Sequence, residues 1–484
     1  MKLSELLGDL PHKLLTGDPN VHIASIAYDS RCVVPQSVFV ALTGHITDGH
    51  RHIGDAIERG ASAVVMQDPL DSNESSTVVE VENSRMALAR MAANYYGNPA
   101  ERLKLIGITG TNGKTSVAYL VRHIIQQVGY RCGMIGTVEY DLGKRVMPAA
   151  RTTPESLDLH NYFNHMVTGG CEYVVMEVSS HALHQYRVHG LRFDTAAFTN
   201  LTRDHLDYHV EMEDYFLAKR KLFEASISNG MIANIDDPYG ARIAEEFKGV
   251  TVGNCESAQL QIESIDLGQM GSSFLFDGIK FKIPLIGRHN VINTAMAIAI
   301  SCQSTGISLE QCRESLVDVG PVPGRLESIE EKQPFGIFID YAHTDDALRN
   351  VLNALREITQ GRLHLVFGCG GNRDKGKRVK MGRVAGEFAD LVTITTDNPR
   401  NENPLIIAEQ IAEGCSGIRK EGWCIELDRA RAIDEVLRSA LPGDTVLIAG
   451  KGHETYQEFD DNVIPFDDRD KVRTALRGLR IRKL

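Results

Sequence analysis

Short uninterrupted apolar runs recur along the chain, and stretches with helical spacing separate them. Residues 103–109 (L-K-L-I-G-I-T) are typical, because a parallel strand buried on both faces has no polar side to present to water. Comparable runs occur at 171–176, 195–198, 231–234, 335–341, 363–367, 391–395 and 445–449. Alternation of strand and helix patterns predicts an α/β fold built on parallel sheets.

Two turn-rich segments interrupt this pattern. Residues 94–99 (N-Y-Y-G-N-P) have the composition of a linker, and residues 320–324 (G-P-V-P-G) place two prolines between two glycines. We therefore predict three α/β domains, over residues 1–100, 101–322 and 323–484.

Two regions carry less regular patterns. Short strand patterns at 23–26 and 37–41 precede a helix-to-strand unit over residues 52–66. Residues 260–286 alternate apolar and polar positions between glycine-rich turns, which favours antiparallel strands.

Composition narrows the classes of function. The chain has 484 residues, of which 43% are hydrophobic and 24% charged, as in ordinary globular proteins. Its formal net charge of −12 argues against a nucleic-acid binder that works through a basic surface, although residues 372–378 (N-R-D-K-G-K-R) could form a local basic pocket.

Cysteine usage and the first residues bear on the compartment. Nine single cysteines without a C-x-x-C pair indicate neither a zinc site nor a disulfide framework, so we expect a reducing cytoplasm. Glu5 and Asp9 interrupt the first leucines, so we expect no signal peptide. No run approaches the roughly 20 apolar residues that span a bilayer.

A glycine-rich loop, T-G-T-N-G-K-T at 109–115, follows one strand pattern and precedes a helical stretch at 116–128. Glycines let backbone N–H groups wrap a phosphate, and the start of the helix adds its positive end. The alternative is a glycine-rich turn with a surface lysine, but the order strand, loop, helix favours nucleotide binding. The predicted nucleotide contacts are Gly110, Thr111, Asn112, Gly113, Lys114, Thr115 and Ser116.

Two further loops follow predicted strands. Glu177 stands in M-E-V-S-S-H at 176–181, and His205 stands in T-N-L-T-R-D-H-L-D-Y-H at 199–209. Each loop alone is more often a solvated surface. Together they bring a carboxylate and an imidazole to the edge of the sheet that carries the glycine-rich loop, which suits a magnesium-assisted phosphoryl transfer.

These stretches and several others resemble motifs of the Mur ligase family. They occur in the same order as in that family, over nearly the whole chain. The further motifs are P-G-R-L-E at 323–327, D-Y-A-H at 340–343, G-N-R-D-K-G-K-R at 371–378, D-N-P-R at 397–400, A-G-K-G-H-E at 449–454, and, in the first domain, D-S-R at 29–31 and D-G-H at 48–50. The resemblance implies a central ATP-binding domain between a first domain that holds a UDP-sugar and a last domain that holds an amino acid.

The resemblance also implies a reaction. Such ligases use ATP to convert a substrate carboxylate into an acyl phosphate, which the amine of an incoming amino acid then attacks. Lys114 would neutralise the transferring phosphoryl group, and the Mg²⁺ ligands would be Thr115, Glu177 and His205. Further ATP contacts are implied for Asn290, Asn293, Arg325, Asp340 and His343.

Lys219 matches a lysine that the family carbamylates, a change that turns an ammonium repelling Mg²⁺ into an anion. The alternative is a solvated helix lysine beside Arg220 and Lys221. By the same resemblance, the contacts to the UDP-sugar peptide are Ser30, Thr152, Thr153, Ser179, Gln185, Arg187 and carbamylated Lys219.

The D-N-P-R stretch bears on the amino acid. In this family it marks ligases that add meso-2,6-diaminopimelate to UDP-N-acetylmuramoyl-L-alanyl-D-glutamate, whereas L-lysine-adding relatives lack its arginine. The guanidinium of Arg400 offers a bidentate fork to the distal carboxylate that lysine lacks, although it could instead pair with Glu402 on the surface. The implied contacts to the amino acid are Arg373, Asp397, Asn398, Pro399, Arg400, Gly450 and Glu454.

Some features leave alternatives open. His289, Asp345 and Asn372 depart from the family pattern, so affinities could differ. An L-lysine-adding ligase, a folylpolyglutamate-synthetase-like ligase, a P-loop kinase and a non-catalytic nucleotide-binding scaffold are the competing functions. We expect a cytoplasmic monomer with small-molecule substrates, and neither nucleic-acid binding nor membrane insertion.

Overall fold

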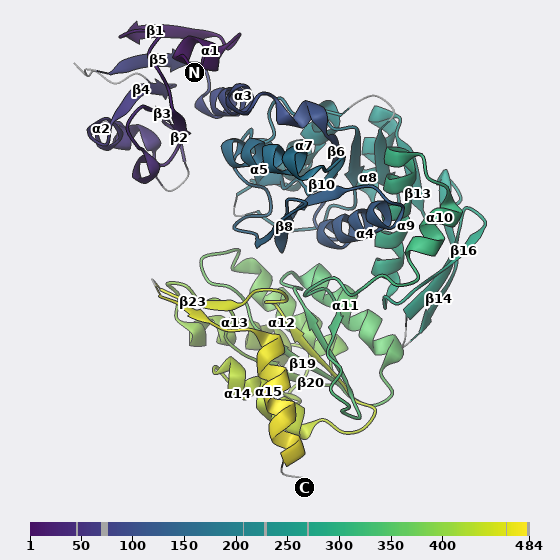
Figure 1. The fold of residues 1–484 in the computed structure, drawn as a ribbon. Helices are drawn as coiled ribbons and strands as arrows, with labels where there is room; N and C mark the ends of the chain where they lie inside the picture. Colours follow the sequence, from purple (N-terminus) through teal and green to yellow (C-terminus); the bar gives the residue numbers. More distant parts are fainter. Residues whose placement is uncertain are drawn as a thin grey trace. The chain divides into compact units, whose positions relative to one another are not determined.

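The computed structural model describes residues 1–44, 47–68, 76–206, 208–226, 230–268, 271–460 and 462–481 (Figure 1). The chain divides into two compact units. The first comprises Met1–Thr109, Gly129–Ala196 and Ala218–Met231, and the second comprises Gly110–Val128, Ala197–Leu217 and Ile232–Leu484. Within the described ranges, no helix combines the length and the apolar character needed to cross a membrane.

The first unit begins with a five-stranded sheet in the order β1-β5-β4-β3-β2. These strands are β1 (His12–Thr16), β2 (Ser25–Ala27), β3 (Ser37–Val40), β4 (Ala61–Met66) and β5 (Thr77–Val81). Strand β1 pairs antiparallel with β5, and the other neighbours pair parallel.

Helices cover both faces of this sheet because side chains alternate along each strand. Val38 and Val65 pack with α1 (Leu3–Leu7) and α3 (Ser84–Tyr96), whereas Phe39 and Val64 pack with α2 (Ile53–Glu58). Three 3-10 turns accompany these elements, namely η1 (Ser30–Cys32), η2 (Gly49–His52) and η3 (Pro99–Arg102).

The first unit also contains strands of the central region. Parallel strands β6 (Lys104–Thr109), β10 (Tyr173–Glu177) and β7 (Cys132–Ile135) lie in the order β6-β10-β7, followed by antiparallel β8 (Glu139–Asp141) and β9 (Val146–Pro148). Glu177 is in register with Ile108, so the carboxylate stands at the carboxyl end of both strands. The accompanying helices are α5 (Ser156–Gly169) and α6 (Ser180–His184).

The remaining central elements belong to the second unit or contain its boundaries. Boundaries fall within β11 (Thr195–Phe198), α7 (Met212–Glu224) and β12 (Met231–Asn234). Strands β12, β13 (Val250–Gly253) and β14 (Leu260–Gly268) pair parallel, and β14, β15 (Gly271–Phe276) and β16 (Ile279–Ile283) pair antiparallel. The helices here are α4 (Lys114–Gln127), α8 (Pro238–Phe247), α9 (Arg288–Thr305) and α10 (Leu309–Ser315).

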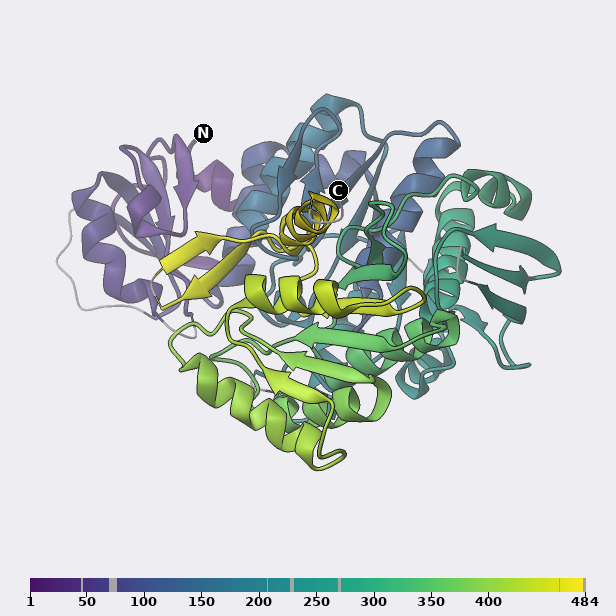
Figure 2. The same ribbon diagram turned by 90° about the horizontal axis from the view of Figure 1, so that it is seen from below.

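The last part of the chain forms a six-stranded sheet in the order β17-β18-β22-β19-β20-β21, seen in Figure 2 as green arrows with helices on both sides. Only β17 pairs antiparallel among these described strands. The strands are β17 (Glu327–Ser328), β18 (Gly336–Asp340), β19 (Leu363–Phe367), β20 (Leu391–Ile394), β21 (Trp423–Ile425) and β22 (Thr445–Ala449).

Alternate side chains of this sheet enter two separate cores. Leu365 and Leu447 pack beneath α11 (Asp345–Ile358), α12 (Gly376–Phe388) and α13 (Pro404–Ser416). Val366 and Ile448 pack beneath α14 (Arg429–Ser439) and α15 (Asp468–Ile481). A hairpin of β23 (Tyr456–Phe459) and β24 (Asn462–Pro465) precedes α15.

The α/β prediction is confirmed, as are the antiparallel strands over 260–286. The expected linker at 94–99 is partly wrong, because α3 continues to Tyr96 and ends at Gly97, whose φ of 69° suits a helix C-terminus. The helix expected from residue 116 begins at Lys114, since Gly113 with a φ of 86° takes the N-cap position. Strands such as β1 and the β23–β24 hairpin escaped prediction because they are short, largely exposed and carry no long apolar run.

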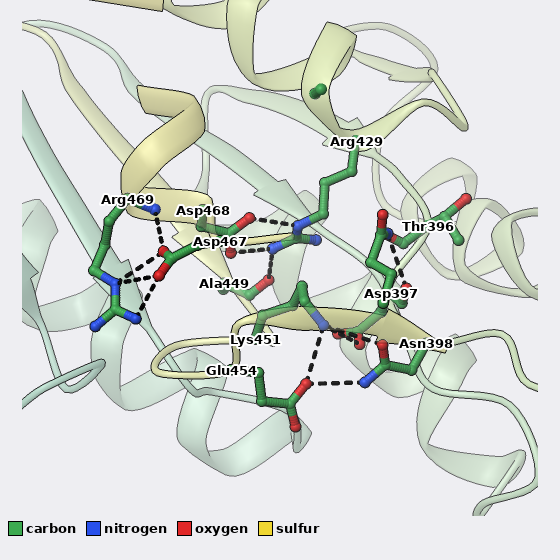
Figure 3. A network of polar contacts seen from close by, with 12 residues as sticks. Thr396, Asp397, Asn398, Arg429, Ala449, Lys451, Glu454, Asp467, Asp468 and Arg469 are labelled. Atoms are coloured by element: carbon green, nitrogen blue, oxygen red, sulfur yellow. Dashed lines mark hydrogen bonds and ion pairs between the residues drawn. The ribbon is translucent and has the colours of Figure 1, made fainter. Parts of the chain in front are cut away.

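A buried ion pair joins the first residues of α14 and α15. Arg429 donates from Nε to Asp468 Oδ1 and from Nη2 to Asp468 Oδ2, both at 2.8 Å, and both side chains are 0% exposed (Figure 3). The pair fixes the helices that cover one face of the C-terminal sheet.

We expect Arg429→Met to destabilise this domain by about 3–5 kcal/mol, because it leaves the Asp468 carboxylate buried and unpaired. Urea unfolding followed by circular dichroism would measure the change. Arg431→Met on the same helix is the control: Arg431 is 66% exposed and pairs with Glu435, so about 1 kcal/mol or less is expected. Equal effects of the two substitutions would contradict the prediction.

Candidate active site

The glycine-rich loop between β6 and α4 requires its glycines. Gly110 and Gly113 have φ angles of 147° and 86°, which favour glycine. A Cβ on Gly113 would collide with Asn293 Oδ1, which places the predicted nucleotide residue Asn293 directly against the loop. The other predicted asparagine, Asn290, donates from Nδ2 to the Ile286 carbonyl at 2.9 Å and helps to fix the start of α9.

A second loop braces this one. Asn200 accepts from the Thr111 N–H through its carbonyl at 2.8 Å and from the Asn112 N–H through Oδ1 at 2.9 Å. Thr199 Oγ1 donates to the Asn112 carbonyl at 2.6 Å. The loop therefore has a fixed shape before any phosphate binds.

Lys114 is half-buried and folds back over the loop. Its Nζ donates to the carbonyls of Gly110 at 3.0 Å and Thr111 at 2.8 Å. Thr115 and Ser116 follow in the first turn of α4, where the helix N-terminus favours an anion. An ammonium, a hydroxyl and a helix N-terminus thus meet at one loop.

Arg325 reaches the same loop from the segment after the predicted domain break. Its Nη2 donates to Thr115 Oγ1 at 3.1 Å, and its guanidinium lies over the Tyr341 ring at 4.7 Å. Asp340, by contrast, accepts from the backbone N–H groups of Leu326 and Ala342, both at 2.7 Å. Asp340 therefore shapes the segment that presents Arg325.

The histidines near this loop differ in surroundings. Burial lowers the pKa of His343 to about 4, so the imidazole is neutral at pH 7, and its Nδ1 lies 2.9 Å from the Tyr341 carbonyl. His205 has a φ of 55°, and its Nε2 lies 3.4 Å from Asp204 Oδ2. Burial alone would raise the pKa of Asp204, but His205, His343 and Lys377 lower it to about 2. Asp204 is thus an anion that orients His205, a role that the sequence did not reveal.

The residues predicted to hold Mg²⁺ have suitable chemistry. The Thr115 hydroxyl and the Glu177 carboxylate are hard oxygen donors, which Mg²⁺ prefers, and both residues are buried. Glu177 is held by the Thr137 N–H at 2.8 Å and the Thr137 hydroxyl at 3.0 Å. Among the described residues, no cluster of three or more His, Cys, Asp or Glu side chains suits a metal.

Four residues predicted to contact the UDP-sugar peptide lie together in the first unit. Thr153 Oγ1 accepts from the Ser179 N–H at 3.1 Å, and Arg187 donates to the Thr153 carbonyl and to Gln185 Oε1, both at 2.8 Å. Thr152 adds its hydroxyl, 3.1 Å from that of Thr137. Ser30 lies apart in η1 of the first domain.

Glu155 organises these residues and was missed in the sequence. Its 8%-exposed carboxylate pairs with Arg187 at 3.1 Å, Arg151 at 2.9 Å and Arg85 at 3.4 Å. One carboxylate among three guanidinium groups leaves net positive charge beside Thr153, which suits an anionic ligand.

Lys219 is 1% exposed, so the alternative of a solvated helix lysine is wrong. Burial disfavours a bare ammonium, and conversion to a carbamate is one way to change that charge. Its neighbour Arg220, 27% exposed and paired with Glu224, is the solvated residue of this stretch.

The predicted amino-acid contacts meet at one edge of the C-terminal sheet. Asp397, Asn398 and Pro399 follow β20, and Gly450 and Glu454 follow β22; both strands neighbour β19. Asn398 Nδ2 donates to Glu454 Oε2 at 2.9 Å. A Cβ on Gly450, whose φ is 109°, would lie 2.5 Å from Asp397 Oδ2. The structure thus brings the residues from the two loops into contact.

Arg400 does not pair with Glu402, so that alternative is wrong. Its Nε lies 2.9 Å from Glu458 Oε2, and its Nη1 donates to the Gly371 carbonyl at 2.8 Å. Within the described part of the chain, Nη2 makes no hydrogen bond. Arg400 is therefore a half-buried, oriented guanidinium with one face left for a ligand.

The basic stretch 372–378 is not a single anion pocket. Arg378 is 0% exposed and donates to Glu402 from Nη1 and Nη2, both at 3.0 Å. The hydrogen bonds from Arg378 lower the pKa of Glu402 to about 2. Arg373 is exposed, and a Cβ on Gly370 would lie 3.1 Å from Arg400 Nη1 and 4.0 Å from Arg373 Cγ, so Arg373 flanks Arg400.

Of the three departures from the family pattern, two are half-buried, His289 and Asp345, and Asn372 is exposed. Burial lowers the pKa of His289 to about 4, so it is a neutral residue at the start of α9. Asp345 is the first residue of α11. Asn372 has a φ of 53° and donates from its backbone to Glu402 at 2.6 Å.

Models of protein families cover most of the chain. The Mur ligase family catalytic domain matches residues 22–96, the Mur ligase middle domain matches residues 108–301, and the Mur ligase glutamate ligase domain matches residues 324–452. The chain belongs to the Mur ligase family. The three-domain α/β prediction and the prediction of a ligase are thereby confirmed, and a P-loop kinase or a scaffold is excluded.

Full-length relatives of this Mur ligase share a name. The UDP-N-acetylmuramoyl-L-alanyl-D-glutamate–2,6-diaminopimelate ligase of Clostridium perfringens is 42% identical over 490 residues, covering 99% of this chain and 100% of the relative. That of Caldanaerobacter subterraneus subsp. tengcongensis is 45% identical over 484 residues, covering 98% and 99%. A solved structure of a ligase with this name has a TM-score of 0.69 at 30% identity and covers 99% of each chain.

For this Mur ligase we expect Lys114→Ala to lower ATP-dependent turnover at least ~10²-fold, the scale for removing one preorganised charge stabiliser. Phosphate release and circular dichroism would be measured together. Lys13→Ala, whose parent side chain is 75% exposed, is the control and should leave turnover unchanged. Near-normal turnover of a folded Lys114→Ala variant would show that the loop does not hold the nucleotide.

Proposed function

We propose that this Mur ligase adds meso-2,6-diaminopimelate to the D-glutamate carboxylate of UDP-N-acetylmuramoyl-L-alanyl-D-glutamate, with ATP as co-substrate. The observation that carries the proposal is the oriented guanidinium of Arg400 beside the acceptors Asp397 and Glu454. Burial raises the pKa of Tyr456, and the charges of Glu454, Glu458, Arg400 and Asp397 also act on it, so these groups lie in one neighbourhood. Such a neighbourhood offers a cation for a carboxylate and anions for an ammonium.

The first step assigned to this chain is activation of the acceptor. The loop from Gly110 to Ser116 would bind the ATP phosphates, with Lys114 leaving the carbonyls it now contacts for the transferring phosphoryl group. Arg325, already on Thr115, would add a second cation to the same charge. Mg²⁺, held by Thr115, Glu177 and His205, would neutralise the negative charges that must approach each other.

The second step is attack by the amine. A carboxylate is a poor electrophile because resonance and charge protect it, and phosphorylation removes both protections. The first domain and the Thr153–Arg187 group would hold the UDP-sugar peptide, with Ser30, Thr152, Ser179 and Gln185. The amine then attacks the acyl phosphate carbonyl, a tetrahedral intermediate forms, and phosphate leaves.

The proposal includes domain roles and context. Residues 1–100 would bind the UDP-sugar, residues 101–322 ATP, and residues 323–484 the amino acid. We further infer a cytoplasmic monomer in peptidoglycan precursor synthesis. Asn290, Asn293, Asp340 and His343 would border the nucleotide, and Arg373, Asn398, Pro399 and Gly450 would complete the amino-acid site.

We also propose that buried Lys219 carries a carbamate in the active enzyme. Lys219→Ala should then be nearly inactive, and a small carboxylate such as formate should restore part of the activity by replacing the anion. Arg220→Ala, at the partly exposed neighbouring position, is the control and should remain active. Full activity of Lys219→Ala, or no rescue together with an unmodified Lys219 in the wild-type crystal, would reject the carbamate.

Arg400→Ala tests the choice of amino acid. The wild type should prefer meso-diaminopimelate over L-lysine by roughly tens-fold to thousands-fold, because only the diacid presents a distal carboxylate to the Arg400 guanidinium. The variant should lose most of this preference while its affinity for ATP stays near normal. Phosphate release with each amino acid measures both the preference between the two amino acids and the affinity for ATP.

Two controls sharpen this experiment. Arg349→Ala removes an exposed arginine that pairs with Glu387 and should keep the preference. Equal use of L-lysine by the wild type would instead favour the lysine-adding branch. Full discrimination by Arg400→Ala would show that another group reads the distal carboxylate.

A further inference from the structure

Lys451 stands out because it is a fully buried lysine inside the proposed amino-acid site. Its side chain is 0% exposed, and its Nζ lies 3.0 Å from Glu454 Oε2, 3.1 Å from Asn398 Oδ1 and 3.9 Å from Asp397 Oδ1. Figure 3 shows its ammonium pointing between Asn398 and Glu454. All three partners are proposed contacts to the amino acid.

The backbone that carries Lys451 is held at both ends. Arg429, paired with Asp468, donates from Nη2 to the Ala449 carbonyl at 3.0 Å, immediately before Gly450. Arg469, paired with Asp467 at 2.7 Å, donates from Nη2 to the His453 carbonyl at 3.3 Å (Figure 3). The D-D-R sequence at 467–469 thus fixes residues 449–453 from the start of α15.

Charge explains why an ammonium is needed here. Asp397 is buried and Glu454 is 17% exposed; they lie on neighbouring loops, and without a cation their carboxylates would repel each other. Burial and Asp397 raise the pKa of Glu454, whereas Lys451 and Asn398 lower it. Lys451 thus offsets part of the negative charge of Asp397 and Glu454 and leaves net negative charge for a ligand.

We propose that Lys451 is the positioning residue of the amino-acid site: its contacts to Asn398, Glu454 and Asp397 hold these groups so that the two carboxylates can accept an ammonium of the ligand. This inference rests on the proposed function, since it concerns the same site. Lys451 has no face toward solvent and contacts the ligand's acceptors rather than the ligand.

The test compares Lys451→Met with Lys451→Arg and with Lys420→Met, a control at an exposed position of the same domain. Calorimetry would measure binding of meso-diaminopimelate and, separately, of ADP. Lys451→Met should weaken diaminopimelate binding by about 10- to 100-fold, the range for losing a residue that orients ligand contacts, with ADP binding unchanged. Lys451→Arg should restore part of the loss, and Lys420→Met should match the wild type.

A pH series separates the charge role from a merely structural one. The charged and titratable groups around Glu454 are Asp397, Lys451, Tyr341, Tyr456 and Arg429. Removing Lys451 should raise the pKa of Glu454, and a protonated carboxyl group cannot hold an ammonium. Diaminopimelate affinity of Lys451→Met should therefore fall as the pH falls from 8 to 6, and that of the wild type should stay nearly constant.

The double variant Lys451→Met, Glu454→Gln removes both charges, so it avoids a buried unpaired carboxylate and covers the case in which Lys451→Met does not fold. It should bind diaminopimelate weakly and without this pH dependence. Two results would overturn the role of Lys451 but not the proposed function. One is wild-type affinity and a flat pH series for Lys451→Met, and the other is wild-type affinity for the double variant. A wild-type protein that binds ADP but no diaminopimelate would overturn the proposed function and this inference with it.

Discussion

Burial of positive charge is the constraint on which the loops at one edge of the C-terminal sheet depend. Arg378, Arg429 and Lys451 are each 0% exposed. A buried cation is tolerated only where anions or carbonyls surround it, and it therefore fixes those partners in place. The partners here are the loops that follow the strands: Glu402 after β20, and Ala449 and Glu454 after β22.

The central region reaches a fixed loop by a different route. Gly110 and Gly113 adopt backbone angles that side chains avoid, and residues 199–200 hold the peptide groups between them. Neither feature requires a buried charge, because a helix N-terminus and backbone N–H groups already favour phosphate. The proposed ATP-binding loop thus depends on backbone geometry, whereas the proposed amino-acid site depends on compensated buried charge.

Sequence patterns predicted the helices and strands whose apolar residues follow a clear pattern along the chain. Buried strands such as β11, β19 and β22 have the expected bounds, because their apolar runs are continuous. Contacts between residues far apart in the sequence were not predictable. In the sequence, Glu155 and Lys451 look like ordinary surface residues, whereas the structure buries them among opposite charges. For the same reason the sequence suggests the near neighbour Glu402 as the partner of Arg400, whereas its partner in the structure is Glu458.

The attachment of Arg400 to the β23–β24 hairpin has an evolutionary consequence. The Arg400 N–H donates to the Glu458 carbonyl at 3.0 Å, the Asp460 N–H donates to the Arg400 carbonyl at 2.9 Å, and the Glu458 carboxylate holds the guanidinium. Loss of the arginine alone would leave the Glu458 carboxylate without its guanidinium partner. A lineage that abandons the diacid would therefore have to change positions 400 and 458 together, and covariation between these two positions is the signature that such a history would leave.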